Sequence, residues 1–484
     1  KISRTMKENN NEILKIQEIS LLLSTINNSL KKVSNKNNDL IIDLQTNNIN
    51  PSKVLSNINI TVGTRGRDIR DSSLGLNNLI YLSLLMMQLE DDTVPKVLSE
   101  NKMDVIKELE DEECEVLDDC FEKSGDKYIL KSDIQKEKYN ELYKFFDINR
   151  DREASFTLLA IEEPEAHLHP SIQRTVYKEV MKENTSILIS THSPFITSIA
   201  PIDSIVHLIP SKESGTKGYS AANIQLTDRQ KLDMQRYIDV KRGEMYFGRG
   251  IILVEGIAEE YLIPKFAELL EIQLDLEGII CCNINGTDFK PYLVFLRELG
   301  IPYVVITDGD YYYHEDEKKI FNEMHSKSNK GIGYDGNDRF VKINEELKII
   351  DLDEIQTALE SDDKWNELDK IFRVNHVHIG EYTLEVDMMN KIATHKESKE
   401  KLFNLFDLMT AGGDLHKNKF KSNFNTKRYN KCLNQIEGNT SKIGKGRFAQ
   451  SLSNICDKNF IPLYIENALK DIRNQITSQK EVKL

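Results

Sequence analysis

Two apolar segments that each end in acidic residues constrain this chain more than any other feature. Residues 251–260 read IILVEGIAEE, and residues 303–310 read YVVITDGD. Short runs of β-branched residues predict buried strands, and helical patterns follow both of them. The carboxyl ends of neighbouring parallel strands lie at the same edge of a sheet. The sequence therefore predicts an α/β fold with an acidic site at that edge.

Four carboxylates define this predicted site: Glu255, Glu259, Asp308 and Asp310. Gly256 is expected to allow a sharp turn after the first strand, and Glu259 falls in the first helical turn, where the helix dipole favours negative charge. Oxygen ligands of this kind suit Mg²⁺ or Mn²⁺ and phosphodiester chemistry. An isolated DGD is more often a turn or a helix cap, but both motifs within one α/β unit favour a metal site.

Composition limits the class of protein. The chain has 484 residues, enough for two or three domains, and a net charge of −14, which argues against a protein that coats DNA over its whole surface. It contains no apolar run near the ~20 residues of a membrane span and no secretory signal. The six cysteines lack metal-ligand spacing. These features predict a cytoplasmic protein without membrane contact.

The pattern along the chain predicts three domains. Residues 1–55 are expected to form a helical arm that serves in oligomerisation. Residues 56–240 alternate strand and helix and are interrupted by an acidic insertion at 91–150. The strand-like runs FTLLAI (156–161), SILIS (186–190) and IVHLI (205–209) predict three strands of one parallel sheet. Between positions 104 and 122 the insertion has ten acidic residues and one lysine, typical of a solvated surface. Residues 241–484 hold the acidic site and a C-terminal helical, basic region.

The domain at 56–240 carries the motifs of a nucleotide-hydrolysing site. FTLLAIEEPEAHLHP (156–170) is a strand followed by two acids, which in ATPases hold magnesium and orient water. We assign Glu162 to the magnesium and Glu163 to the water. SILISTHSPF (186–195) is a second strand that leads to His192, which can sense the γ-phosphate of ATP.

A third motif, DSSLGLN at 71–77, precedes a helix, and its Ser72, Ser73 and Gly75 suit a phosphate offered by a partner subunit. Together the three motifs resemble the second lobe of an ABC-type ATPase head, as found in SMC and RecF proteins. His167 and His169 would be weak zinc ligands, since no cysteine accompanies them.

The phosphate-cradling GxxxxGK[ST] loop does not occur in the sequence. Either the lobe that carries this loop is not part of this chain, or the ATPase is vestigial. The first explanation is favoured, because intact downstream motifs have little reason to persist on an inactive site.

The VEG-x-x-E and D-x-D motifs resemble the Toprim domain of topoisomerases, primases and certain nucleases. Two later segments specify the type. GEYTLEVDMM (380–389) follows a strand-like VHVHI and supplies Glu385 and Asp387, and SKIGKGRFAQSL (441–452) supplies Lys445. An ATPase head followed by these Toprim motifs resembles the OLD (overcoming lysogenization defect) family, which includes nucleases of the Gabija anti-phage system and of some retrons.

The resemblance implies an ATP-regulated DNA endonuclease of anti-phage defence that works with two Mg²⁺ or Mn²⁺ ions. Lys445 would neutralise charge on the scissile phosphate. The implied metal ligands are six carboxylates: Glu255, Glu259, Asp308, Asp310, Glu385 and Asp387. In the alternative reading, Glu385 and Asp387 are exposed strand residues and Lys445 is an ordinary surface lysine.

Residues 416–447 form the strongly basic stretch, with nine lysines and arginines, one acid, and Phe420, Phe424 and Tyr429 between them. This composition predicts a surface that binds the phosphates of DNA, with an affinity that falls as the salt concentration rises. The alternative is a solvated basic helix that balances the acidic insertion.

Two rival functions remain open. A Toprim topoisomerase would need a nucleophilic tyrosine, for which Tyr311, Tyr312 and Tyr313 are candidates. A non-catalytic mediator of recombination would use the Toprim domain to bind proteins. ABC-type heads bind ATP between two subunits, so a homodimer or larger homo-oligomer is expected, and a helicase or a reverse transcriptase is compatible as a partner.

Overall fold

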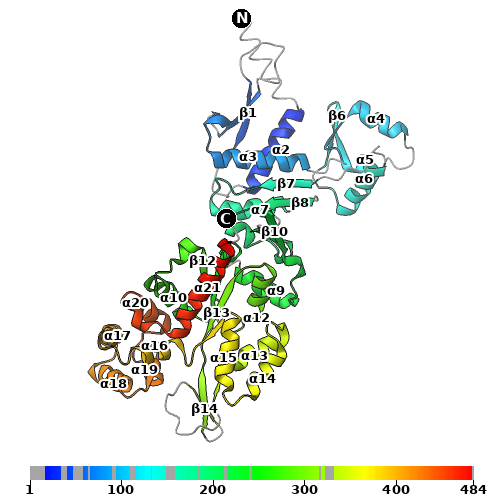
Figure 1. The fold of residues 1–484 in the computed structure, drawn as a ribbon. Helices are drawn as coiled ribbons and strands as arrows, with labels where there is room; N and C mark the ends of the chain where they lie inside the picture. The colour runs from blue at the N-terminus through cyan, green and yellow to red at the C-terminus, as the bar shows by residue number, and fades with distance from the viewer. Residues whose placement is uncertain are drawn as a thin grey trace. The chain divides into compact units, whose positions relative to one another are not determined.

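The computed structural model describes the chain in segments that form two compact units (Figure 1). The units comprise residues 1–196 and 197–484, and each is described by itself. The described segments are 17–33, 41–46, 58–63, 66–89, 94–109, 115–131, 133–148, 158–181, 186–211, 215–238, 242–315, 318–321 and 332–481.

The first unit begins with a helix and an antiparallel sheet. Helix α2 (Gln17–Val33) confirms the helical pattern near the N-terminus. The expectation that residues 1–55 are entirely helical is wrong, because β1 (Ile42–Thr46) pairs with β2 (Ile58–Val62). Ile42 and Leu44 alternate with polar residues, a period of two that buries one face of a strand. Most of the remaining arm lies outside the described residues.

Two parallel strands carry the ATPase motifs. β7 (Leu158–Glu162) pairs with β8 (Ser186–Ser190), and α7 (Pro170–Val180) connects them, as expected of an α/β unit. Their core includes Ile161 of β7 and residues of α2, α3 (Leu74–Leu89) and α7.

The expected third strand of this sheet lies elsewhere. β9 (Val206–Ser211) forms an antiparallel hairpin with β10 (Gly215–Ser220) in the second unit. The predicted strand does form, but it pairs with β10 and does not join β7 and β8. Strand pairing depends on contacts that a local pattern does not specify.

The acidic insertion has a small core of its own around residues such as Leu117 and Leu142. A three-stranded antiparallel sheet in the order β4-β6-β5 supports three helices. The elements are β4 (Val97–Ser99), α4 (Glu100–Leu109), α5 (Glu115–Cys120), β5 (Phe121–Ser124), β6 (Lys127–Leu130) and α6 (Lys136–Ile148).

The second unit is built on a parallel four-stranded sheet in the order β12-β11-β13-β17. The predicted strands at 251 and 303 are its two central members. The strands are β11 (Gly250–Val254), β12 (Ile279–Asn283), β13 (Tyr303–Thr307) and β17 (Val377–Ile379).

Helices cover both faces of this sheet (Figure 1). Ile252 and Val254 belong to one hydrophobic core, whereas Ile251 and Leu253 belong to the other, so β11 is buried on both sides. This explains its continuous apolar run, which is typical of central parallel strands.

One face is covered by α10 and the C-terminal helices and the other by α12 to α15. The first group comprises α10 (Ile257–Leu269), α16 (Leu384–Ile392), α17 (Lys396–Met409), α18 (Asp414–Asn425), α19 (Tyr429–Glu437), α20 (Lys445–Ser453) and α21 (Leu463–Glu481). The second comprises α12 (Lys290–Glu298), α13 (Asp335–Leu347), α14 (Leu352–Glu360) and α15 (Lys364–Val374).

A small antiparallel sheet follows the D-x-D motif. It has the order β15-β14-β16 and comprises β14 (Tyr311–Glu315), β15 (Lys318–Phe321) and β16 (Gly333–Tyr334). The tyrosine run lies in β14, where the Tyr311 ring packs edge-on against Tyr334 and Tyr382. Among the helices in the described segments, none is both long and apolar enough to cross a membrane.

Candidate nuclease centre

The strand order of the second unit creates a natural binding position. The chain leaves β11 for β12 on one side and returns past β11 to β13 on the other. In open α/β sheets such a reversal leaves a crevice at the carboxyl ends of the two adjacent strands. Glu255 follows β11 and Asp308 follows β13, so the two predicted acidic strand ends flank this crevice.

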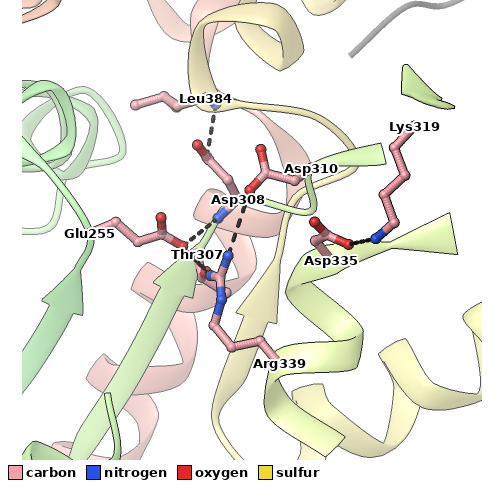
Figure 2. Close-up of polar contacts among 8 residues, drawn as sticks. All are labelled: Glu255, Thr307, Asp308, Asp310, Lys319, Asp335, Arg339 and Leu384. Carbon is pink, nitrogen blue, oxygen red and sulfur yellow. Dashed lines mark hydrogen bonds and ion pairs between the residues drawn. The ribbon is translucent and has the colours of Figure 1, made fainter. Parts of the chain in front are cut away.

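Glu255 is held by a cationic residue that the motifs did not reveal. Its Oε1 accepts a hydrogen bond from Arg339 Nη1 at 2.8 Å and others from the Thr307 hydroxyl and the backbone N–H of Asp308 (Figure 2). Arg339 Nη2 also lies 3.6 Å from Asp310 Oδ2. The guanidinium therefore sits between two of the predicted metal ligands.

The glycine between the two aspartates permits a close backbone approach. A Cβ on Gly309 would lie 2.0 Å from the carbonyl oxygen of Gly380. Gly309 N–H donates to the carbonyl of Tyr382, which joins this loop to the segment after β17. Asp310 has a φ of 49°, in the left-handed region that is strained for most residues. The D-G-D motif is thus shaped by this contact and does not continue the strand.

Glu259 and Glu385 are the buried members of the cluster, and Asp308 beside them is partly buried. Burial raises the pKa of Glu259 to about 7, and Glu385 and Glu255 push it in the same direction. Burial also raises the pKa of Asp308 well above its usual range, with Glu259 and Glu255 as its strongest charged neighbours. Asp308 Oδ1 accepts the backbone N–H of Leu384 at 2.9 Å, which fixes it beside the start of α16 (Figure 2).

Gly256 does not act as expected, because its φ of −144° is extended backbone that any residue adopts. The turn into α10 therefore does not depend on a special glycine conformation. Its lack of a side chain still leaves room for Glu259, whose Oε2 would lie 3.1 Å from an added Cβ.

Glu385 and Asp387 lie on helix α16 and are buried, so the alternative reading of exposed strand residues is wrong. Glu385 joins the cluster from the other side, and burial raises its pKa despite the nearby Lys445. Asp387 accepts the backbone N–H groups of Glu381 at 3.1 Å and Tyr382 at 3.2 Å. Burial raises the pKa of Asp387 to about 8.

Lys445 begins α20 and reaches the cluster. Its Nζ lies 3.7 Å from Glu385 Oε2 and 3.4 Å from Glu437 Oε1. Although burial lowers the pKa of Lys445, Glu385 and Glu437 outweigh burial and raise it above its usual range. A permanently charged ammonium therefore borders the carboxylates.

The donor set fits divalent cations in its chemistry. Several carboxylates lie close together, and their mutual repulsion contributes to their raised pKa values. Bound divalent cations, which prefer oxygen ligands, would relieve this repulsion. Thr383 Oγ1 is also buried there without a hydrogen-bond partner. As the side chains stand, however, no group of three or more His, Cys, Asp or Glu in the described segments is arranged to hold a metal ion. Arg339 contributes the cationic charge between Glu255 and Asp310 instead.

In the first unit the structure brings together two of the predicted ATPase residues. His192 Nε2 lies 3.7 Å from Glu163 Oε1, and both side chains are exposed. Glu163 has a φ of 46°, a left-handed conformation directly after β7. Glu162 is also exposed at the end of β7, opposite Ser190 in the register of the two strands.

Glu165 is a further acid of this motif, and the sequence pattern predicted no role for it. Its Oε1 accepts hydrogen bonds from the Thr191 hydroxyl and from His192 N–H at 2.6 and 2.8 Å. Its Oε2 is buried without a partner. The carboxylate is visible in the EEPE sequence, but only the structure shows that it joins the end of β7 to the end of β8.

Ser72, Ser73 and Gly75 lie at the start of α3. Ser73 Oγ accepts the N–H of Leu76 at 3.4 Å, and a Cβ on Gly75 would lie 2.4 Å from the carbonyl oxygen of His167. The segment thus packs against the EEPEAHLHP loop.

His169 caps α7 with its Nδ1, which accounts for this histidine without zinc.

The basic stretch forms α18, α19 and the start of α20. Its aromatic residues Phe420, Phe424 and Tyr429 are buried in the hydrophobic core, so they cannot stack on bases. Six cations on its surface are exposed: Lys419, Lys427, Arg428, Lys431, Lys442 and Arg447.

These features define a mixed α/β protein with an ATPase-type unit and a Toprim region. Comparison with known families agrees. The family described as "Overcoming lysogenization defect protein-like, TOPRIM domain" matches residues 246–310, and an AAA domain family (putative AbiEii toxin, Type IV TA system) matches residues 130–198.

Curated relatives include the endonuclease GajA of Bacillus cereus strain VD045, 23% identical over 296 residues that cover 56% of this chain and 48% of GajA. The OLD nuclease of Thermus scotoductus is 24% identical over 241 residues, 41% of this chain and 45% of that protein. The chain therefore spans less than half the length of these relatives.

Among solved structures, the C-terminal region of the Burkholderia pseudomallei OLD protein is 28% identical and covers 48% of this chain and 99% of that one, with a TM-score of 0.37. The family and sequence matches support an OLD-family ATPase–nuclease.

Proposed function

We propose that this chain is a divalent-metal-dependent DNA endonuclease whose cleavage is regulated by ATP, and that it serves in anti-phage defence. The observation that carries the proposal is the buried carboxylate cluster at the ends of β11 and β13, with Lys445 beside it. The relatives named as nucleases support the reaction class.

The cluster's residues divide into ligands and supporting groups. Mg²⁺ or Mn²⁺ bound here would activate water and stabilise the departing oxygen. Glu255, Glu259, Asp308, Asp310 and Glu385 would hold the ions, together with the Thr383 hydroxyl. Asp387 stays a predicted ligand, although its two backbone hydrogen bonds favour a positioning role for the β17–α16 loop.

Lys445 supplies charge at the place where a scissile phosphate would lie. Its ammonium stays protonated because Glu385 and Glu437 raise its pKa. A fixed cation that stabilises negative charge developing on the phosphate lowers the barrier without a proton transfer. The exposed cations of residues 416–447 would bind the DNA backbone.

We also propose that ATP controls this centre through the domain at 56–240, which carries the ATPase motifs. Glu162 would hold magnesium, Glu163 would orient water, and His192 beside it would sense the γ-phosphate. Ser72, Ser73 and Gly75 would contact nucleotide bound by a second subunit, which makes a homodimer or larger assembly the working form. The arm at 1–55 would support that assembly, and a helicase or a reverse transcriptase would fit as a defence partner.

Plasmid cleavage tests the proposal. Supercoiled DNA incubated with the protein should be nicked or linearised with Mg²⁺ or Mn²⁺, and ATP should change the rate. No product should form in EDTA. Absence of cleavage under every metal condition would favour the non-catalytic mediator, and a covalent protein–DNA adduct would favour the topoisomerase.

A further inference from the structure

A separate cavity opens beside the carboxylate cluster. Its volume is about 490 Å³, and it is lined by the starts of α13 and α21, by one side of α15, by α16, and by the end of β17 with the segment that follows it. Cavities of ~300–1,000 Å³ are the usual size for small-molecule sites. Gly380 and Glu381 line it, and Gly309, which lies between Asp308 and Asp310, packs directly against Gly380. The cavity and the candidate nuclease centre therefore share a wall.

Aromatic rings form part of the lining. Trp365 and Tyr334 meet edge-on with their centroids 5.3 Å apart, and both are partly exposed. Lys364 Nζ lies 4.3 Å from the centroid of the Trp365 ring, which places a cation at this aromatic group. A flat heteroaromatic ligand gains stacking energy on such rings, and a phosphate near it would gain from the lysine.

Polar groups of the kind that read base edges complete the lining. Asn337 is buried, with 4% of its surface exposed, and Asn390 is partly exposed on α16. Asp369 is paired with Arg373 at 2.6 Å, and burial raises its pKa. Amide and carboxylate oxygens accept hydrogen bonds from the exocyclic amino and ring N–H groups of bases.

We propose that this cavity is a nucleobase site, which takes a base unstacked from the DNA strand next to the cleavage position. The inference rests on the proposed nuclease function, because the shared wall places the base near the scissile phosphate. Enzymes that act on nucleic acid commonly move a base out of the stack into a pocket with aromatic and hydrogen-bonding walls. A free nucleotide carries the same base, and the experiment below distinguishes it from a base of a DNA strand.

The chain offers a direct probe, because Trp365 is its single tryptophan. All tryptophan fluorescence of this chain therefore reports on this cavity. In EDTA, where no cleavage occurs, a short single-stranded oligonucleotide should change this fluorescence saturably. An abasic strand of the same length and inorganic phosphate should bind about tenfold more weakly or not at all, given stacking of ~1–3 kcal/mol per base.

Variants separate the cavity from general DNA binding. Trp365→Ala should weaken anisotropy-measured binding of the base-bearing strand about 5- to 100-fold and leave the abasic strand unchanged. Trp365→Phe, which keeps a ring, should bind nearly as tightly as the wild type. Asn390→Ala gives a second test should Trp365→Ala not fold, and Tyr139→Ala, an exposed aromatic of α6, is the matched control.

The outcomes distinguish the inference from the function beneath it. Equal binding of base-bearing and abasic strands, with plasmid cleavage intact, overturns the nucleobase site alone. Base-dependent binding without any cleavage overturns the nuclease proposal and leaves the site. If mononucleotides change the fluorescence and oligonucleotides do not, the base comes from a free nucleotide and its displacement from DNA is wrong.

Discussion

At the scale of residues, the acidic positions of the candidate centre were predictable and their cationic counterpart was not. Glu255 and Asp308 follow apolar strands, so the pattern itself places them at one edge of the sheet. Arg339 comes from α13, in a region without any motif, and reaches Glu255 through tertiary packing. Asp310 and Glu163 both hold left-handed backbone, a cost that surrounding contacts must offset.

Replacing Arg339 tests whether this guanidinium competes with metal ions. Arg339→Gln removes the positive charge between Glu255 and Asp310, so Mn²⁺ should bind about tenfold more tightly, since one charge at this range is worth on the order of 1–4 kcal/mol. The metal-free protein should melt at a lower temperature, because the carboxylates then repel without compensation. Isothermal titration calorimetry and thermal melting without DNA measure both effects.

Lys342→Gln on the exposed side of α13 is the control and should change neither quantity. Weaker Mn²⁺ binding in Arg339→Gln would mean that the arginine supports the metal ligands and does not compete with the ions.

At the scale of elements, sequence patterns identified the strands and helices of both units better than their partners. The alternation at β9 predicted a strand correctly, whereas its pairing with β10 depends on contacts outside the segment. Glu385 and Asp387 follow a strand, but Thr383 precedes a helical start, and α16 buries both acids. The aromatic residues of the basic stretch follow helical spacing, so they pack inward in place of facing DNA.

Asp471 joins the last long helix, α21, to the parallel sheet through hydrogen bonds to two histidines. Asp471 Oδ2 lies 2.9 Å from His378 Nε2 and 3.0 Å from His376 Nδ1. Burial opposes ionisation of Asp471, but the hydrogen bonds with the two histidines prevail and lower its pKa. A carboxylate whose pKa is lower in the folded protein than in the unfolded chain stabilises the fold at pH values above its ordinary pKa. That stabilisation is lost as the pH falls below the ordinary pKa.

Asp471→Asn should therefore lower the stability of the second unit at neutral pH by about 1–3 kcal/mol. The corresponding melting temperature should fall by about 2–6 °C. The difference from the wild type should narrow below about pH 4, where Asp471 begins to take up a proton in the unfolded chain but stays ionised in the folded protein. Thermal melting across pH measures it, with Asn474→Ala on the exposed side of α21 as control. A difference that widens below about pH 4 would contradict the hydrogen bonds assigned to Asp471.

In the molecule as a whole, charge is distributed unevenly, so a net charge of −14 is compatible with the proposed DNA binding. Acidic residues concentrate in the insertion and in the metal-type cluster, while the exposed cations gather on α18 to α20. The division into an ATPase-type and a Toprim-type part was predictable from motif order. The packing of helices on both sheet faces required long-range contacts that no local pattern contains.

Salt dependence of DNA binding tests the basic surface. Replacing Lys427, Arg428 and Lys431 with alanine should reduce the slope of log affinity against log salt by about 2 to 3, one counterion for each lost phosphate contact. Fluorescence anisotropy in EDTA provides the measurement. Lys102→Ala in the insertion should leave the slope unchanged, and an unchanged slope in the triple variant would place DNA elsewhere.

We propose that the cluster at the ends of β11 and β13 performs metal-dependent cleavage. Asp308→Asn is its sharpest test, because the amide oxygen can still accept the Leu384 N–H while the ligand charge is lost. Plasmid cleavage with Mn²⁺ should fall about 100-fold or more, a loss of several kcal/mol. DNA binding and the melting temperature should persist, and Asp335→Asn, whose carboxylate pairs with Lys319, should cleave normally. Cleavage by Asp308→Asn at the wild-type rate would contradict the assignment of the site.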